Sequence, residues 1–404
     1  MPVLSLKSFV RHFELYDRQY SQARYRTILE KYFEHDAKAS LLAELKQWNL
    51  SMDSTDFWKE QVRSKQQISP TDSSFKIETD LQEILALSDI LFLAPNEHST
   101  LKPQVFGLAT LHSLCDYILS DLMETTDSTE NNRLTDDEFM IITRTIYAID
   151  AKTKSIREAK LDLLSLSARM TGNKAGVVEG IANLLTKLPR NRLLNLNKIG
   201  EVELQTTYYD ALLSEIIADQ DRNVALRWAN KSSSEEGSDI RPDAIISTLM
   251  QHDFGYPVGF GEVKPGNSST TKHSVCMDIL RLGIASKRAI DKWHLSGCLA
   301  FMINGFYISF FVVRKQHKHL YTMTEIGAMT AASSLSELHS FASLKNLDML
   351  SNIGHCFWNH CNATDTIPNV ESTSIDDGFV IHISDFYALI DKSRNKARGM
   401  SSRY

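Results

Sequence analysis

The residues best suited to chemistry in this chain are an aspartate and a Glu-Val-Lys triplet in its second half. Asp243 follows an Arg-Pro pair, and eighteen residues separate it from Glu262, which precedes Lys264 by two positions. Mg²⁺ prefers oxygen ligands and commonly takes one or two protein carboxylates together with a phosphate. Residues two apart in a strand face the same side, so Glu262 and Lys264 can face one site. The set predicts metal-assisted cleavage of a phosphodiester, with Asp243 and Glu262 as metal ligands.

Strands on either side of a turn must position these residues. Residues 243–250 form an apolar run typical of a strand, residues 251–257 have the composition of a hairpin turn, and residues 258–263 form the returning strand. Asn-Gly at positions 304–305 is a second hairpin signal. The other elements expected here are a helix over 274–293 and strands over 298–303, 306–313 and 319–323. Together they predict an α/β core around the acidic and lysine residues.

The chain is locally basic around this core. Between positions 255 and 320 there are nine Lys or Arg residues against three acids, although the whole chain has a formal net charge of -6. A phosphate-binding groove needs such a local excess of positive charge. The alternative interpretation of these charged residues is structural: a solvated strand edge with surface ion pairs worth ~0–1 kcal/mol each. The candidate nucleic-acid-binding residues are Arg241, Lys272, Arg281 and Lys287.

These motifs, in this order, resemble the PD-(D/E)XK nuclease superfamily. The resemblance rests on Arg-Pro-Asp243, on Gly-Glu262-Val-Lys264 and on the helix from Asp278 to Asp291, and it is strongest to nuclease-like domains of many fungal proteins. It covers roughly residues 200–350. It implies a restriction-endonuclease-like core, a mixed sheet flanked by helices. It also implies that Asp243 and Glu262 hold Mg²⁺, that Lys264 orients or activates the attacking water, and that DNA is cut rather than RNA.

The resemblance leaves two questions open. An acid on the first helix often completes the site in this superfamily, and both Glu203 and Glu215 are available. Glu203 is preferred, because the site is expected at the end where that helix begins. The superfamily also includes inactive members, and a fold alone does not establish a reaction. The alternative to a Mg²⁺-dependent nuclease is therefore a catalytically inactive module that binds nucleic acid or a protein partner.

The length of 404 residues exceeds one ordinary core and predicts several domains. Residues 1–195 are expected to form a mainly helical N-terminal region, which could support a homodimer or hold a protein partner. Residues 196–355 correspond to the nuclease-like domain, and residues 356–404 to a helical extension with a basic tail. Within the first region, helices are expected over 77–93 and 108–123. Thr135 followed by Glu138 predicts a capping box that opens a helix extending to about Met170.

Composition excludes several other classes of protein. Five cysteines without framework spacing favour free thiols in a reducing compartment. No apolar run approaches the ~20 residues needed to cross a bilayer, and no secretory leader is evident. We therefore expect an intracellular protein, nuclear or cytoplasmic, without a membrane partner. A compact cluster of His355, Cys356, His360 and Cys361 invites a zinc site, but its spacing favours a packed helix instead.

Overall fold

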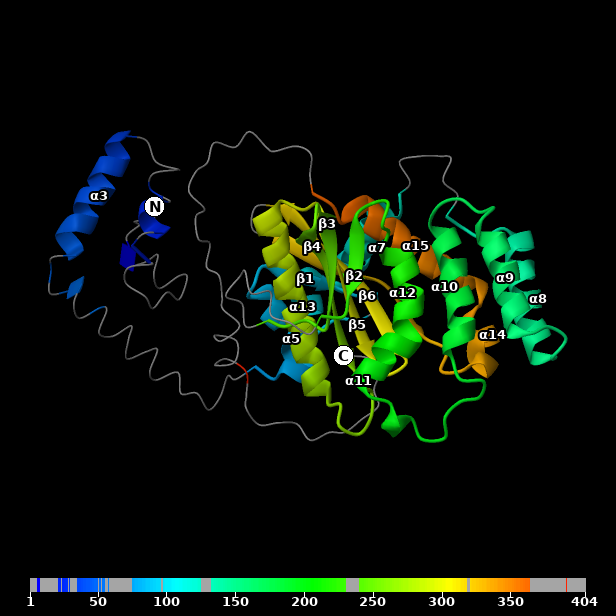
Figure 1. The fold of residues 1–404 in the computed structure, drawn as a ribbon. Helices are drawn as coiled ribbons and strands as arrows, with labels where there is room; N and C mark the ends of the chain where they lie inside the picture. The colour runs from blue at the N-terminus through cyan, green and yellow to red at the C-terminus, as the bar shows by residue number, and fades with distance from the viewer. Residues whose placement is uncertain are drawn as a thin grey trace. The chain divides into compact units, whose positions relative to one another are not determined.

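The computed structural model divides the chain into two compact units, Met1–Ser74 and Phe75–Tyr404, both drawn in Figure 1. In the first unit helix α3 (His35–Asn49) contributes Leu45 to a small core with Tyr25 and Leu29. The predicted C-terminal extension beyond residue 363 and its basic tail lie outside the described residues, apart from residue 390. The described residues are 75–363 except 96, 125–131, 230–239 and 318–319, then 390, and before residue 75 they are 6–7, 21–22, 24–27, 29, 35–49, 51, 53–54 and 57.

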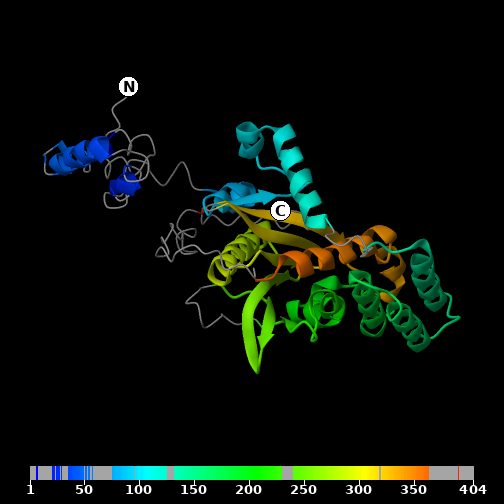
Figure 2. The same cartoon turned by 90° about the horizontal axis from the view of Figure 1, so that it is seen from above.

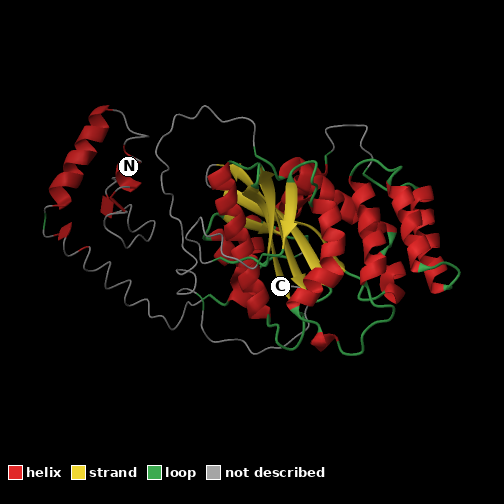
Figure 3. Cartoon of the chain, in the orientation of Figure 1, coloured by secondary structure: helices red, strands yellow, loops and turns green. Residues whose placement is uncertain are grey.

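The second unit is built on a mixed sheet of seven strands, in the order β1-β7-β6-β5-β4-β3-β2 (Figure 3). Neighbouring strands are antiparallel except at β1–β7 and β4–β5, which are parallel. The central strands are nearly continuous apolar runs, as expected where both faces of a sheet are covered. The strands are β1 (Ile90–Leu93), β2 (Val224–Arg227), β3 (Ala244–Met250), β4 (Asp253–Lys264), β5 (Gly297–Asn304), β6 (Tyr307–His317) and β7 (Leu320–Thr330).

Helices cover both faces of this sheet, as Figure 2 shows. The crossover between the parallel strands β4 and β5 is helix α13 (Lys272–Trp293), which packs on one face beside α5 (Ile77–Ala86). Helix α15 (Leu344–His360) packs on the other face. The remaining helices are α6 (Leu101–Phe106), α7 (Leu108–Met123), α8 (Asp136–Asp150), α9 (Ile156–Ser167), α10 (Asn173–Lys187), α11 (Glu201–Glu203), a π-helical turn (Leu204–Tyr209), α12 (Asp210–Ile217) and α14 (Leu338–Phe341). The predicted α/β class, with a helical N-terminal region, is confirmed.

The β3–β4 hairpin explains the long gap between Asp243 and Glu262. The expected turn over 251–257 is much shorter in the structure, because β4 already begins at Asp253 and Gln251 has a positive φ of 56°. The extra residues lengthen the two strands instead. Register shifts on either side of Ser247 absorb the mismatch between them.

Two expectations about the helical region were wrong. The helix predicted over 77–93 ends at Ala86, and Ile90–Leu93 is strand β1, since Asp89 adopts a positive φ of 61° that breaks the helix. The helix predicted to reach Met170 is two helices, α8 and α9. The Thr135–Glu138 capping box is confirmed, and a second capping box formed by Ser155 and Glu158 starts α9.

The predicted boundary at residue 195 lies inside the second compact unit. β1, from the supposed helical region, is a strand of the sheet through its pairing with β7, where Ile90 lies opposite Tyr321. Helix α10 packs against both α12 and α15, and α15 itself crosses the boundary predicted at 355. These contacts join segments far apart in the sequence, so local composition could not reveal them.

Candidate functional site

The antiparallel register of β3 and β4 brings Asp243 and Glu262 together. The ladder ends where Ala244 lies opposite Gly261, and the side chains of the two residues that follow at this end, Asp243 and Glu262, share a hydrogen bond. Asp243 Oδ2 accepts a hydrogen bond of 2.8 Å from the backbone N–H of Val263. Both side chains are buried, at 8% and 4% exposure. The predicted pair of metal ligands therefore shares one location at the end of β4.

Lys264 reaches the same location and contacts an acid that the spacing argument did not select. Its Nζ lies 2.7 Å from Oδ2 of Asp278, a residue of α13 that is 1% exposed. The other oxygen of Asp278, Oδ1, accepts a hydrogen bond of 2.7 Å from Arg281 Nη1. One buried carboxylate thus holds two cations that the sequence had assigned to catalysis and to nucleic-acid binding.

The electrostatics of the site reflect an excess of buried carboxyl groups. Burial, followed by the charges of Asp278 and Asp243 and a hydrogen bond with Asp243, raises the pKa of Glu262 to about 10. Burial also raises the pKa of Asp278, although Lys264 and Arg281 oppose it. Burial alone would lower the pKa of Lys264, but the three carboxylates around it outweigh that effect and raise the pKa. Burial and the neighbouring carboxylates therefore favour the protonated form of Glu262 when no cation is bound.

A fourth carboxyl group comes from the first helix, and it is Glu201. Burial raises the pKa of Glu201, Lys264 opposes that shift, and the charges of Asp243 and Asp278 add to it. Glu203, the preferred sequence candidate, is exposed, and burial, followed by the charge of this glutamate, raises the pKa of Tyr208. The helix does begin at the site as expected. The acid on its inward side lies two positions earlier than the one chosen.

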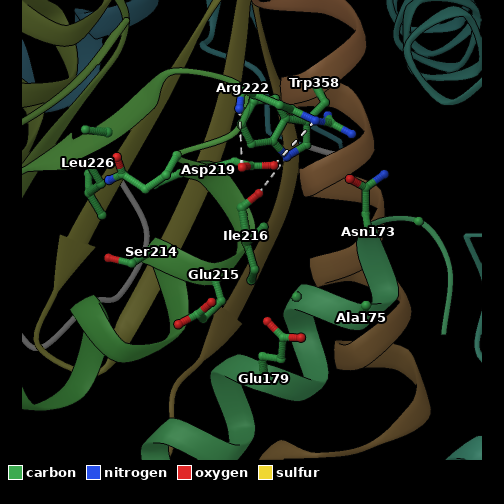
Figure 4. A pocket seen from close by; sticks show the side chains of 15 residues that line it. Asn173, Ala175, Glu179, Ser214, Glu215, Ile216, Asp219, Arg222, Leu226 and Trp358 are labelled. Carbon is green, nitrogen blue, oxygen red and sulfur yellow. Dashed lines mark hydrogen bonds and ion pairs between the residues drawn. The ribbon is translucent and has the colours of Figure 1, made fainter. Parts of the chain in front are cut away.

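Glu215, the other candidate, lies in a separate pocket of about 700 Å³ between α10, α12, β2 and α15 (Figure 4). There it accepts a hydrogen bond of 2.8 Å from Asn183. Burial and the nearby charge of Glu179 raise its pKa. On the loop that closes this pocket, the Arg222 guanidinium lies 4.6 Å from the centre of the Trp358 ring. Glu215 therefore belongs to different surroundings from Asp243 and Glu262.

The predicted nucleic-acid-binding residues fall into two groups. In the first group, Arg241 is exposed two residues before Asp243, and Lys272 is exposed in the first turn of α13. Arg281 belongs to the same group because it is hydrogen-bonded to Asp278. Lys287 instead donates a hydrogen bond of 2.8 Å to the carbonyl of Ser88 and lies 3.0 Å from Asp89. Nine residues of helix separate it from Asp278, or roughly 14 Å. Lys287 therefore fastens α13 to the loop before β1 and lies away from the site.

Asp278 was missed because its role depends on how α13 packs. One signal was present in the sequence. Val275, Ile279 and Leu282 define the buried face of α13 at helical spacing, and Asp278 falls on that same face. An acid on an otherwise apolar face needs a cationic partner.

The carboxyl groups of the site are of the chemical kind that binds hard cations. Asp243, Glu262 and Glu201 offer only carboxyl oxygens, which suit Mg²⁺ or Mn²⁺ rather than softer metals. Within the part of the chain that the structure describes, no three His, Cys, Asp or Glu side chains are close enough to hold a metal unaided. Two carboxylates and a phosphate would still satisfy Mg²⁺, which keeps several waters.

The His/Cys cluster of α15 is part of the core, as its spacing indicated. His355 is 2% exposed and its Nδ1 lies 2.9 Å from the side-chain amides of Asn132 and Asn359. Cys356 Sγ donates to the carbonyl of Leu122 at 3.4 Å. All five cysteines are free and buried.

The fold and the site together define a mixed α/β domain with a buried carboxylate–lysine cluster where β4 ends. Comparison of the chain with protein-family models, with curated proteins and with solved structures finds no match. Among the helices that the structure describes, none is long and apolar enough to span a bilayer.

Proposed function

We propose that this protein is a Mg²⁺-dependent nuclease. The observation that supports this most directly is the meeting of Asp243, Glu262 and Lys264 at the end of one strand pair. The resemblance of these residues to the PD-(D/E)XK motif supports the same reaction, and it favours DNA as the substrate. A buried site in which carboxyl groups outnumber cations also suits a divalent ion.

In the proposed reaction each residue of the site would have a different role. Lys264 would donate an N–H to the attacking water or to a non-bridging phosphate oxygen. Arg281 and Lys272 would hold the phosphate and set its direction of approach. Mg²⁺ held by Asp243 and Glu262 would stabilise the negative charge that develops on the phosphate. The product would carry a 5′-phosphate, as the resemblance implies.

The test is cleavage of labelled single- and double-stranded DNA and RNA, with and without Mg²⁺. Wild type should cleave only with the metal, and Lys264→Ala should cleave at least 100-fold more slowly. Lys345→Ala, which removes an exposed lysine of α15 outside the site, is the matched control and should behave as wild type. Cleavage by Lys264→Ala at the wild-type rate would contradict the proposal.

The second candidate is a nuclease-like module that binds nucleic acid or a protein without turnover. It is favoured by the lack of a complete three-ligand metal group among the described residues. Such a module should bind nucleic acid equally well with and without Mg²⁺, and its affinity should fall with rising salt. Salt-dependent binding without cleavage in the same assay would favour this candidate over the nuclease.

A further inference from the structure

Asp278 lies at a buried position, where the desolvation of a carboxylate is unfavourable. Its neighbours in sequence, Met277 and Ile279, are buried apolar residues, and α13 buries this face against the sheet. A carboxylate removed from water is tolerated only when cations and hydrogen bonds replace its hydration. Here Lys264 and Arg281 both do so, each on its own oxygen at 2.7 Å.

The contact with Asp278 fixes the direction of the Lys264 ammonium. An ammonium has three N–H donors. Asp278 Oδ2 is the ion-pair partner of the Nζ at 2.7 Å, and the carbonyl of Val263 accepts a hydrogen bond from it at 3.3 Å. The third has no acceptor among the described residues, and Lys264 remains 21% exposed along its side chain. One donor is thus left for a water or a phosphate oxygen beside Asp243 and Glu262.

The same carboxylate also orients Arg281, three residues further along α13. The Arg281 side chain is 33% exposed, so part of it is accessible to solvent. A guanidinium is a planar fork of N–H donors, and Arg281 donates one of them to Asp278 Oδ1 at 2.7 Å. Because Lys264 and Arg281 both pair with Asp278, which is fixed on α13, the conformational freedom of both side chains is limited.

We propose that Asp278 is the positioning residue of this site, holding the Lys264 ammonium and the Arg281 guanidinium in the directions that cleavage requires. The inference rests on the nuclease function proposed above. It assigns Asp278 no contact with substrate, so the residue acts through Lys264 and Arg281. A long lysine side chain without such a tether samples many rotamers and seldom adopts the reactive geometry.

The test compares Asp278→Asn with Asp291→Asn. Asp291 is a matched control, because it is also an α13 carboxylate bound to a lysine, at 2.8 Å from Lys315 Nζ, but near the far end of the helix. Asp278→Asn should lower kcat at least 30-fold and change KM less than 3-fold, whereas Asp291→Asn should stay within 3-fold of wild type. Asp278→Glu, which keeps the charge, should recover part of the lost kcat.

A second readout does not depend on cleavage. Acetylation of Lys264 by an amine-reactive ester, quantified by mass spectrometry, should be at least 3-fold faster in Asp278→Asn than in wild type. The circular dichroism spectrum should show that the variant is folded, and Asp278→Ala, which also removes the carboxylate, serves in its place if it is not.

Three results would overturn the inference. The first is a folded Asp278→Asn, or a folded Asp278→Ala in its place, that keeps kcat within 3-fold of wild type. The second is an equal loss in Asp278→Asn and Asp291→Asn. The third is a wild-type chain that cleaves nothing, which removes the proposed function and the positioning role with it. In that case faster acetylation would still show that the ion pair forms, so the two failures are distinguishable.

Discussion

Asp243 Oδ2 accepts the backbone N–H of Val263, the residue between Glu262 and Lys264. This bond joins the start of β3 to the end of β4 at the point where the site is formed. One oxygen of Asp243 is therefore used to hold the strand ends together. Asp243 has a structural role and a proposed metal-binding role in the same carboxyl group.

The two roles of Asp243 can be separated by two substitutions. Asp243→Asn keeps an acceptor for the Val263 N–H and should change the free energy of unfolding by less than about 1 kcal/mol. Asp243→Ala leaves that buried N–H unpaired and should destabilise the fold by about 1–3 kcal/mol. Both should abolish Mg²⁺-dependent cleavage, because a charged metal ligand is lost. Urea unfolding and the cleavage assay measure the two effects, and equal stability of the two variants would contradict the assignment.

Glu262 should make the metal-free protein less stable at neutral pH. Its pKa is raised to about 10 when folded, against about 4.3 unfolded. The unfolded chain therefore loses this proton first, and the contribution of Glu262 to stability falls as pH rises between those values. Glu262→Gln removes the titration, and it should stabilise the metal-free protein at pH 7.5 by about 1–3 kcal/mol.

Added Mg²⁺ should reduce the difference in stability between wild type and Glu262→Gln. An ion that binds only the folded state stabilises it by mass action, and Glu262 is one of the two proposed ligands. Thermal unfolding is measured without Mg²⁺ and with Mg²⁺ at ten times its dissociation constant. The ion should raise the Tm of wild type but not that of Glu262→Gln. An equal rise in both proteins would show that Mg²⁺ does not bind through this carboxylate.

The sequence predicted the parts of the site that depend on local order. Asp243, Glu262 and Lys264 belong to one hairpin, and strand periodicity is enough to put them on one edge. Glu201 and Asp278 enter from two helices, and whether they face the site depends on how those helices pack on the sheet. For Asp278 a local signal existed, an acid on an apolar helix face, whereas nothing local separated Glu201 from its neighbour Glu203.

The fold was likewise predicted where elements are long and periodic. Helix α7 was expected over its observed bounds, and α13 was expected within two residues of its start. The two edge strands, β1 and β2, have only four residues each. Strands that short carry little periodicity, so β1 was taken as the end of a helix and β2 was missed. The sheet therefore extends on both edges beyond what the sequence indicated.

The basic residues around the site should differ in their contribution to DNA affinity. Arg241→Ala and Lys272→Ala remove exposed charges, so each should weaken binding to DNA and reduce the salt dependence by about one released counterion. Lys287→Ala should leave binding unchanged but lower stability, because it breaks the contacts with Ser88 and Asp89. Fluorescence anisotropy across a salt series measures the slopes. A slope reduced only in Lys287→Ala would place the groove elsewhere.

Lys102 should give the protein a pH dependence unrelated to the proposed site. It is 6% exposed and donates a hydrogen bond to the carbonyl of Phe92 at the end of β1. Burial lowers its pKa to about 8, with Cys115 and Glu83 opposing, whereas an unfolded lysine titrates near 10.4. Between these values the unfolded chain binds more protons, so the contribution of Lys102 to stability rises with pH.

Lys102→Met keeps the length of the side chain and removes the titration. Buried cysteines such as Cys298, whose pKa is raised to about 12 by burial, act in the opposite direction over the same range. The informative quantity is therefore the difference between the two proteins. From pH 7.5 to pH 10, wild type should gain about 1–2 kcal/mol in free energy of unfolding relative to Lys102→Met. Parallel curves from denaturant titrations across that range would mean that Lys102 keeps its ordinary pKa when the chain is folded.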